Sequence, residues 1–154
     1  MKVYLETSFV SACVTTRTDA SSIHRKKESL EWWESERHKH RLLVSDEVLI
    51  ELGNPAYPTR SEALAFIRDV PVLAINDEAL GLARIFIAEQ VMPLPLGGDA
   101  MHVAVATFAH AEYILSWNVR HLANPNKKLH LAKICMRLGL TPPAIVTPES
   151  LWEE

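Results

Sequence analysis

Short apolar runs recur along the chain, and each is too short to form a helix. Because their apolar residues are consecutive, these runs are typical of strands that are covered on both faces of a sheet. They are residues 2–5 (KVYL), 41–45 (RLLVS), 70–75 (VPVLAI), 113–116 (YILS) and 144–148 (AIVTP). The sequence therefore predicts a sheet of about five strands.

Longer segments between these runs repeat their apolar residues at helical spacing. Met101, Ala104, Val105 and Phe108 form such a stripe in the helix that we expect at residues 99–110. Ser45 is expected to cap the helix at residues 46–52. Thr7 and Ser8 are expected to cap a helix that follows them, and Asn76 or Asp77 is expected to cap another. The remaining expected helices span residues 22–38, 59–68 and 127–139.

The alternation of strands and helices predicts an α/β fold, a three-layer sandwich with a central parallel sheet. The length of 154 residues suits one domain, so we expect residues 1–154 to form a single domain. In such folds the functional crevice lies beyond the carboxyl ends of the strands, near the point where the strand order reverses. Polar residues that directly follow the strands are therefore the first candidates for a site.

Composition places the chain among soluble globular proteins, since 48% of its residues are hydrophobic and 23% are charged. No apolar run is long enough to span a membrane, and the first residues lack the features of a signal peptide. The cysteines, Cys13 and Cys135, have no metal-binding spacing. We therefore expect a protein of the reducing cytoplasm that has no membrane partner.

The net charge of −3 argues against broad, non-specific attraction to nucleic acid. Two basic segments, residues 24–27 (HRKK) and 37–41 (RHKHR), leave a local basic face open, because phosphate contacts depend on where the cations lie. The acidic stretch between them, ESLEWWESE, favours a solvated helix of mixed charge instead.

Four polar side chains occur where the strands are expected to meet a crevice. Glu6 follows the first strand and Glu51 lies in the helix after the second. Asp99 begins the helix before the fourth strand, and Asn118 follows that strand. Three carboxylates gathered in one crevice would repel one another unless a cation were present. Oxygen ligands suit a hard ion, Mg²⁺ or Mn²⁺, which activates water and stabilises charge on a phosphodiester.

Each of these residues also has a structural interpretation. Asp99 follows two glycines and is well placed as a helix N-cap. Glu51 has a rival in Glu47, which lies one turn earlier on the same helix face. Asn118 alone is typical of a turn. Glu6 is the hardest to explain structurally, because a carboxylate directly after a buried strand needs partners.

Four segments together resemble the PIN domain, the metal-dependent ribonuclease fold of VapC-type toxins in prokaryotic toxin–antitoxin pairs. They are VYLETSFV, VSDEVLIEL, GGDAMHVAVATFAHAEYILSWNVRHL and IVTPESL, and they occur in the family's order across essentially the whole chain. The most specific motif is D-x-x-H-x-A-x-A, followed by a strand and SWN-x-x-H-L. The second is L-E-T-S near the start of the chain.

The resemblance implies a PIN-like parallel sheet with a Mg²⁺ or Mn²⁺ site at the strand ends. Glu6 takes the place of the family's first acidic residue, which is commonly Asp. Glu51, in preference to Glu47, matches its conserved Glu, and Asp99 matches the third acidic residue. Asn118 falls where many members carry a fourth. Glu6, Glu51 and Asp99 are thereby implied as metal ligands and, together with Asn118, as the catalytic residues.

Two departures from the family's pattern bear on the chemistry. Glu6 keeps the negative charge but is one methylene longer than Asp. Asn118 offers a neutral carbonyl oxygen and an NH₂ donor in place of a carboxylate. We therefore expect one tightly held ion, with a possible second that arrives with the RNA phosphate, and an activity that is weakened or absent.

Residues beside this set have either supporting or plain structural roles. Thr7, Ser8 and Ser116 are able to hydrogen-bond carboxylates or metal-bound waters, although helix capping explains Thr7 and Ser8 equally well. His102 lies one turn after Asp99 on the same helix face. It is expected to brace that carboxylate, to contact phosphate, or simply to pack the helix.

The segment beyond the fourth strand carries two basic residues. Arg120 and His121 are expected to meet the RNA backbone. Trp117 stands between Ser116 and Asn118, and we expect it to pack beneath the site rather than to stack on a base.

The resemblance predicts a metal-dependent endoribonuclease that hydrolyses RNA phosphodiester bonds as the toxin of a type II toxin–antitoxin pair. Its expected partners are an RNA substrate, an antitoxin protein and a second copy of the chain. The alternative is a PIN-like module that no longer cleaves and acts in RNA or protein binding. A doubly wound phosphatase or nucleotide-binding protein fits less well, because the sequence has no Gly-rich phosphate loop.

Overall fold

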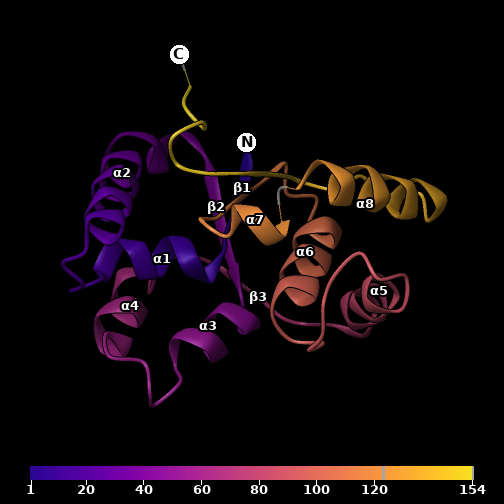
Figure 1. Ribbon diagram of the computed structural model, residues 1–154, viewed down its shortest axis with the longest axis horizontal. Helices are drawn as coiled ribbons and strands as arrows, with labels where there is room; N and C mark the ends of the chain where they lie inside the picture. Colours follow the sequence, from indigo (N-terminus) through magenta and orange to yellow (C-terminus); the bar gives the residue numbers. More distant parts are fainter. Residues whose placement is uncertain (123, 154) are drawn as a thin grey trace.

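A parallel sheet lies at the centre of the molecule (Figure 1). The computed structural model of the chain describes residues 1–122 and 124–153, except for the side chains of residues 119 and 121. Within this part, five strands pair in parallel in the order β3-β2-β1-β4-β5. They are β1 (Lys2–Leu5), β2 (Arg41–Ser45), β3 (Val72–Leu73), β4 (Tyr113–Leu115) and β5 (Ala144–Val146). The predicted α/β fold with a parallel sheet is confirmed.

The strand order reverses at β1, the central strand. Along the chain, β2 and β3 extend the sheet on one side of β1, and β4 and β5 then extend it on the other. A parallel sheet with such a reversal opens a crevice beyond the carboxyl ends of the strands that flank it. Leu5 pairs with Leu115 at the ends of β1 and β4, so a site is expected just beyond these two residues.

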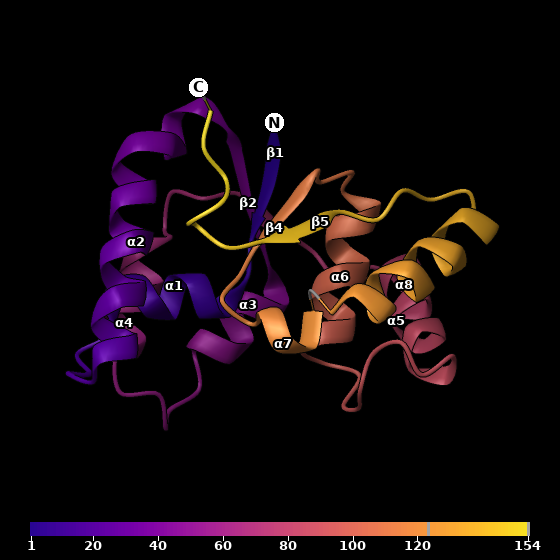
Figure 2. The same ribbon diagram turned by 45° about the horizontal axis from the view of Figure 1, so that its top comes forward.

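Helices cover both faces of the sheet. They are α1 (Thr7–Val14), α2 (Ala20–Glu36), α3 (Asp46–Leu52), α4 (Arg60–Phe66), α5 (Asp77–Ala88), α6 (Asp99–Phe108), α7 (Val119–Leu122), α8 (Pro125–Arg137) and the 3-10 helix η1 (Arg37–Lys39). Figures 1 and 2 show α1 to α4 on one side of the sheet and α5, α6 and α8 on the other. The arrangement is the predicted three-layer sandwich.

Polar side chains begin several of these helices. Glu6, Asp19, Asn76 and Asn124 each accept a backbone N–H bond from the first turn of a helix. Of the two residues predicted to cap α5, Asn76 rather than Asp77 is the cap, since the Ala79 N–H donates to Asn76 Oδ1 at 2.8 Å. Ser45 precedes α3 but makes no side-chain cap, because its hydroxyl is bound to the Tyr4 hydroxyl at 2.7 Å.

Some element bounds differ from the predicted ones. β3 spans only Val72–Leu73, because the Val70 N–H turns back to the Ile67 carbonyl and Pro71 has no N–H to donate. α8 begins at Pro125, earlier than predicted, because Asn124 caps it and proline suits the first turn. The short helix α7 was not predicted, since a single turn leaves no periodic pattern.

The core fills the space between the sheet and its helical layers. Val3, Tyr4 and Leu5 of β1 are fully buried, and α6 is buried from Ala100 to Thr107. The predicted apolar stripe is therefore only part of the buried surface of α6, because this helix packs against α5 and α3 as well. In the described part of the chain, no helix combines the length and the apolar character that crossing a membrane requires.

Candidate active site

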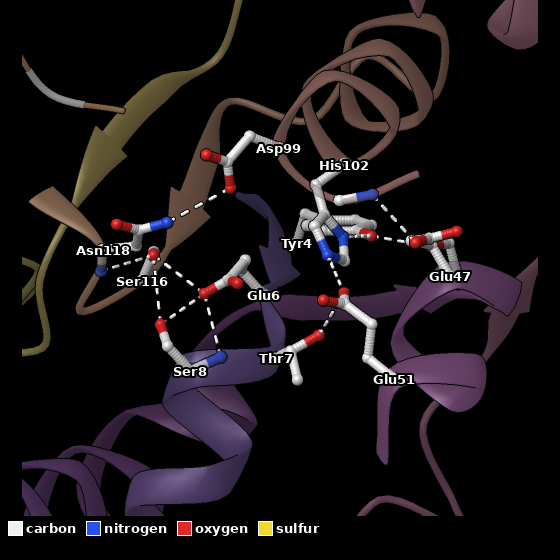
Figure 3. A network of polar contacts seen from close by, with 12 residues as sticks. Tyr4, Glu6, Thr7, Ser8, Glu47, Glu51, Asp99, His102, Ser116 and Asn118 are labelled. Atoms are coloured by element: carbon white, nitrogen blue, oxygen red, sulfur yellow. Dashed lines mark hydrogen bonds and ion pairs between the residues drawn. The ribbon is translucent and has the colours of Figure 1, made fainter. Parts of the chain in front are cut away.

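The ends of β1 and β4 deliver polar residues to one place. The Glu6 N–H donates to the Leu115 carbonyl at 3.1 Å, so Glu6 and Ser116 leave the sheet side by side. Figure 3 shows Glu6 after β1, Glu51 on α3 and Asp99 at the start of α6 reaching toward one another. We call these three carboxylates, together with Asn118, the acidic centre.

Glu6 is held by hydroxyl and amide donors. It is only 5% exposed, and it caps α1 by accepting the Ser8 N–H at 2.9 Å. The same oxygen, Oε2, accepts the hydroxyls of Ser8 and of Ser116, the latter at 2.9 Å. A buried carboxylate is costly without such donors, so the predicted need of Glu6 for partners is met by Ser8 and Ser116.

Glu51 lies opposite Glu6 and is held by two different side chains. Its Oε1 accepts the Thr7 hydroxyl at 2.9 Å and also binds His102 Nε2. Burial raises the pKa of Glu51, but the hydrogen bond from His102, the charge of His102 and the Thr7 hydroxyl outweigh burial. The pKa of Glu51 is therefore below its ordinary value. Glu51 is therefore an anion at neutral pH, with its side chain 34% exposed.

His102 is fully buried behind Glu51 and continues a chain of hydrogen bonds into the core. Its Nδ1 lies 2.6 Å from the Tyr4 hydroxyl, which in turn contacts the Ser45 hydroxyl at 2.7 Å. Burial lowers the pKa of His102, but the Glu51 hydrogen bond and the surrounding carboxylates raise it above the ordinary value. We call this series the Tyr4–His102–Glu51 chain (Figure 3).

The position of His102 corrects two predicted roles. Its described partners are Glu51 and Tyr4, so it braces Glu51 rather than Asp99. Because it is fully buried, it also has no surface from which to contact a phosphate. Spacing along α6 suggested Asp99 as the partner, whereas the packing of α3 against α6 supplies Glu51.

Asp99 and Asn118 meet across the mouth of the site. Asn118 Nδ2 donates to Asp99 Oδ1 at 3.1 Å, and the Asn118 N–H donates to the Ser116 hydroxyl at 2.9 Å. The amide thus gives Asp99 a donor where a fourth carboxylate would repel it. Asp99 is not the N-cap of α6, because that position is occupied by Gly98.

Glu47 has a role that the sequence did not reveal. It is 9% exposed, and its Oε1 accepts the Gly98 N–H at 2.9 Å. A Cβ on Gly97 would lie 2.9 Å from the same oxygen, and Gly98 has a φ of 98°. Glu47 therefore fastens the tight turn from which Asp99 begins α6. The sequence signal for Glu47 was its position one turn before Glu51 on the same helix face. That position suggested a rival metal ligand and did not show a contact with Gly98.

Trp117 forms part of the wall behind the acidic centre. Its N–H donates to the Ser8 hydroxyl at 2.8 Å, and its indole Nε1–H donates to the Ser29 hydroxyl at 2.8 Å. With 8% of its surface exposed, it packs as expected. Arg120 is exposed on α7, and its contact with RNA stays a prediction. The side chain of His121 lies outside the described part of the structure.

The carboxylate oxygens of the acidic centre are of the chemical type that a hard divalent ion prefers. Among the described residues, each carboxylate uses one oxygen in hydrogen bonds, which leaves Glu6 Oε1, Glu51 Oε2 and Asp99 Oδ2 without a protein partner. No three Asp, Glu, His or Cys side chains in residues 1–122 and 124–153 are grouped closely enough to hold a metal ion as they stand. Mg²⁺ usually takes one or two carboxylates directly and keeps several waters, so its binding does not require such a group.

Several solved structures have folds similar to that of this chain. No protein-family model matches the sequence, and no curated protein matches it either. The fold resembles VapC20 of Mycobacterium tuberculosis, described as a toxin that cleaves the sarcin–ricin loop, with a TM-score of 0.60, 20% identity and coverage of 79% of this chain and 93% of the other.

Two further structures match almost the whole chain. VapBC2 from Rickettsia felis, bound to a DNA fragment from its promoter, matches with a TM-score of 0.56, 13% identity and coverage of 99% of this chain and 100% of the other. FitAcB from Neisseria gonorrhoeae matches with a TM-score of 0.57, 10% identity and coverage of 97% and 99%. At these identities the likeness shows the fold alone, and that fold is the PIN-like α/β fold that the sequence predicts.

Proposed function

We propose that this protein is an endoribonuclease that depends on Mg²⁺ or Mn²⁺ and acts as the toxin of a type II toxin–antitoxin pair. The observation that carries the proposal is the acidic centre, in which Glu6, Glu51 and Asp99 come from separate segments to the carboxyl end of the sheet. The fold supports it as well, because the chain shares that fold with a toxin described as cleaving the sarcin–ricin loop.

The three carboxylates would hold the ion through the oxygens that have no partner among the described residues, and their other oxygens are fixed by neighbours. Ser8 and Ser116 fix Glu6, Thr7 and His102 fix Glu51, and Asn118 fixes Asp99. When bound, Mg²⁺ or Mn²⁺ supplies a Lewis acid for the phosphate charge and lowers the pKa of a water molecule. Such fixed partners keep carboxylates oriented during a reaction.

The test uses purified protein, a structured RNA and either Mg²⁺ or Mn²⁺. Wild-type protein is compared with Asp99→Asn, which keeps the shape of the side chain and removes its charge. Asp77→Asn is the matched control, because Asp77 also begins a helix, α5, and is exposed away from the acidic centre. We expect metal-dependent cleavage that Asp77→Asn retains and Asp99→Asn loses. Equal cleavage by wild type and Asp99→Asn would contradict the proposal.

A second candidate function is a PIN-type module that binds RNA or protein without cleaving. It is favoured by the two departures at the acidic centre, since Glu6 is engaged as a helix cap and Asn118 is uncharged. Binding of intact RNA by wild-type protein, with no cleavage in either metal, would favour this function.

The remaining partners are also proposals. We expect an antitoxin protein, a second copy of the chain and a cytoplasmic location. Cys13 and Cys135 are both buried and free, which agrees with a reducing compartment. Co-purification with the product of an adjacent small gene, followed by size-exclusion chromatography, tests the antitoxin and the dimer together.

A further inference from the structure

A groove opens beside the acidic centre, on the side of α1 and α2. It has a volume of about 360 Å³, within the range of ordinary ligand sites. Its walls come from α1, the first turns of α2, the segment before α4, and Trp117. We call it the arginine groove, and the residues that matter for its chemistry are Ser8, Ser11, Thr15, Arg17, Arg25 and Trp117.

The arginine groove adjoins the acidic centre at Ser8. This side chain lines the groove, yet its hydroxyl donates to Glu6 and accepts the Trp117 N–H. A second hollow of about 400 Å³ is bordered by Glu47, Glu51 and Asp99, so it includes two carboxylates of the acidic centre. A chain-like ligand at the acidic centre that extends past Ser8 would therefore enter the arginine groove.

The two neighbouring surfaces have opposite charge. The acidic centre gathers carboxylates, whereas the groove is lined by two exposed arginines, Arg17 and Arg25. Arg17 has a surface ion pair with Asp19 at 3.2 Å, and such exposed pairs are weak enough to leave the arginine available to another anion. Arg25 lies over the Trp117 ring at 5.5 Å from its centroid, which holds the guanidinium at the groove.

The remaining lining suits a phosphate–sugar backbone more than an apolar ligand. Hydroxyl groups of Ser8, Ser11 and Thr15 line the floor, and hydroxyls commonly bind phosphate and sugar oxygens. Lys26 Nζ binds the Thr15 carbonyl at 2.9 Å and so fixes the loop that carries Arg17. Trp117 is too buried to serve as a platform for a base, so it acts as a wall.

We propose that the arginine groove binds the backbone of single-stranded RNA next to the phosphodiester held at the acidic centre, with Arg17 and Arg25 paired to phosphates. The inference rests on the proposed function and adds a binding site to it. A single strand fits the size of the groove, whereas an A-form duplex does not enter a hollow of this volume. The basic segment at residues 24–27 contributes through Arg25, while residues 37–41 lie at the other end of α2.

The test measures binding of a fluorescent single-stranded RNA oligonucleotide in EDTA, so that binding is observed without cleavage. The Arg17→Gln/Arg25→Gln variant is compared with wild type and with Arg68→Gln/Arg84→Gln, which removes two exposed arginines outside the groove. We expect roughly tenfold weaker binding for the groove variant alone. Because each phosphate contact contributes about 0.7 to the slope of log K against log salt, its slope should fall by about 1.4.

If the groove variant keeps the wild-type slope, or if the control variant loses as much, the inference is overturned, and an acidic protein segment becomes the better occupant. Absence of RNA binding by wild type overturns it too. Cleavage by wild type with an unchanged slope in the groove variant overturns the groove and leaves the nuclease. A reduced slope without any cleavage supports the groove and overturns the nuclease.

Discussion

Two glutamate–histidine pairs lie at opposite ends of the sheet, and they are built differently. At the carboxyl end, His102 binds Glu51 with one ring nitrogen and Tyr4 with the other. At the amino end, His40 Nε2 lies 3.5 Å from Glu36, and neither ring nitrogen has a hydrogen bond in the described structure. Both histidines are buried, so the difference lies in their surroundings.

The Glu36 pair is sealed by the end of the chain. Glu36 is 1% exposed and accepts bonds from Lys39 Nζ at 2.7 Å and from the Glu153 N–H at 3.1 Å. Trp32 stacks on His40 with a centroid distance of 5.8 Å and donates its indole N–H to the Leu151 carbonyl at 2.6 Å. Both carboxylate oxygens of Glu36 thus have protein partners, as is typical of a contact that stabilises the fold.

The Glu51 pair instead leaves its carboxylate open to solvent. The side chain of Glu51 is 34% exposed, against 1% for Glu36. The same two residue types thus form a sealed contact at one end of the sheet, whereas at the other end they leave a carboxylate that is partly open to solvent. Substitutions that remove only charge are able to separate these roles.

The largest expected effect is that of Glu51→Gln on RNA cleavage. The substitution keeps an acceptor for His102 and Thr7 but removes the charge with which Glu51 would hold the proposed ion. We expect cleavage to fall by about 100-fold or more, with a change in unfolding free energy below about 1 kcal/mol. Initial cleavage rates and thermal unfolding measure the two effects. A large loss of stability with normal cleavage would reverse the roles assigned to the two pairs.

Glu36→Gln is expected to show the opposite result. Lys39 would lose its buried anionic partner, whereas the contacts of residues 151–153 with this region would persist. The unfolding free energy should therefore fall by about 1–3 kcal/mol. Cleavage per folded molecule should stay at the wild-type rate, because Glu36 lies at the amino end of the sheet. Denaturant titration gives the stability, and each of the two glutamine variants is the control for the other.

Tyr4→Phe tests whether the support behind Glu51 matters. The substitution removes the hydroxyl that binds His102 Nδ1 and leaves that buried nitrogen without its partner. We expect about tenfold weaker metal binding or activity, since partners of metal ligands contribute on this scale, and partial rescue at high Mg²⁺ concentration. Tyr113→Phe on the neighbouring strand β4 is the matched control. Equal activity of Tyr4→Phe and Tyr113→Phe across all Mg²⁺ concentrations would show that the Tyr4–His102–Glu51 chain of hydrogen bonds does not position Glu51.

The sealed pair also predicts a response to acid. Burial raises the pKa of Glu36, but the Lys39 hydrogen bond, the Glu153 N–H and the charge of Lys39 bring it below the ordinary value of 4.5. A depressed carboxyl pKa stabilises the folded state above the ordinary value, and this contribution is lost as pH falls through the folded-state pKa. From about pH 5 to about pH 3, wild type should therefore lose more unfolding free energy than Glu36→Gln. Parallel acid curves for the two proteins would refute the assignment.

The smallest expected effect is that of Asn118→Asp. It replaces the donor to Asp99 by a fourth carboxylate, so the metal-free protein should lose less than about 1 kcal/mol of stability. Added Mg²⁺ should raise the melting temperature of this variant more than that of wild type, because the ion offsets the new repulsion. Thermal unfolding with and without Mg²⁺ measures the difference, and an equal Mg²⁺ response would indicate that position 118 does not face the ion.

The sequence by itself determined the order of the elements and the parallel sheet. Consecutive apolar residues mark a strand covered on both faces, and this signal is local. It also placed Glu6 directly after one strand and Asn118 shortly after another, and thus near the edge where the carboxyl ends of the strands meet. The sequence did not predict the short length of β3 or the single turn of α7, because hydrogen bonds to other segments decide such bounds.

The tertiary structure alone decided which partners the polar side chains have. Helical spacing left His102 three roles, namely bracing Asp99, contacting phosphate or packing the helix, but it binds Glu51, which is separated from it by 51 positions. Glu47 was read as a rival ligand, yet it fastens the Gly98 turn across the same separation. Helical spacing shows which residues share a face, whereas the helix packed against that face sets the contacts, and that packing depends on the whole core.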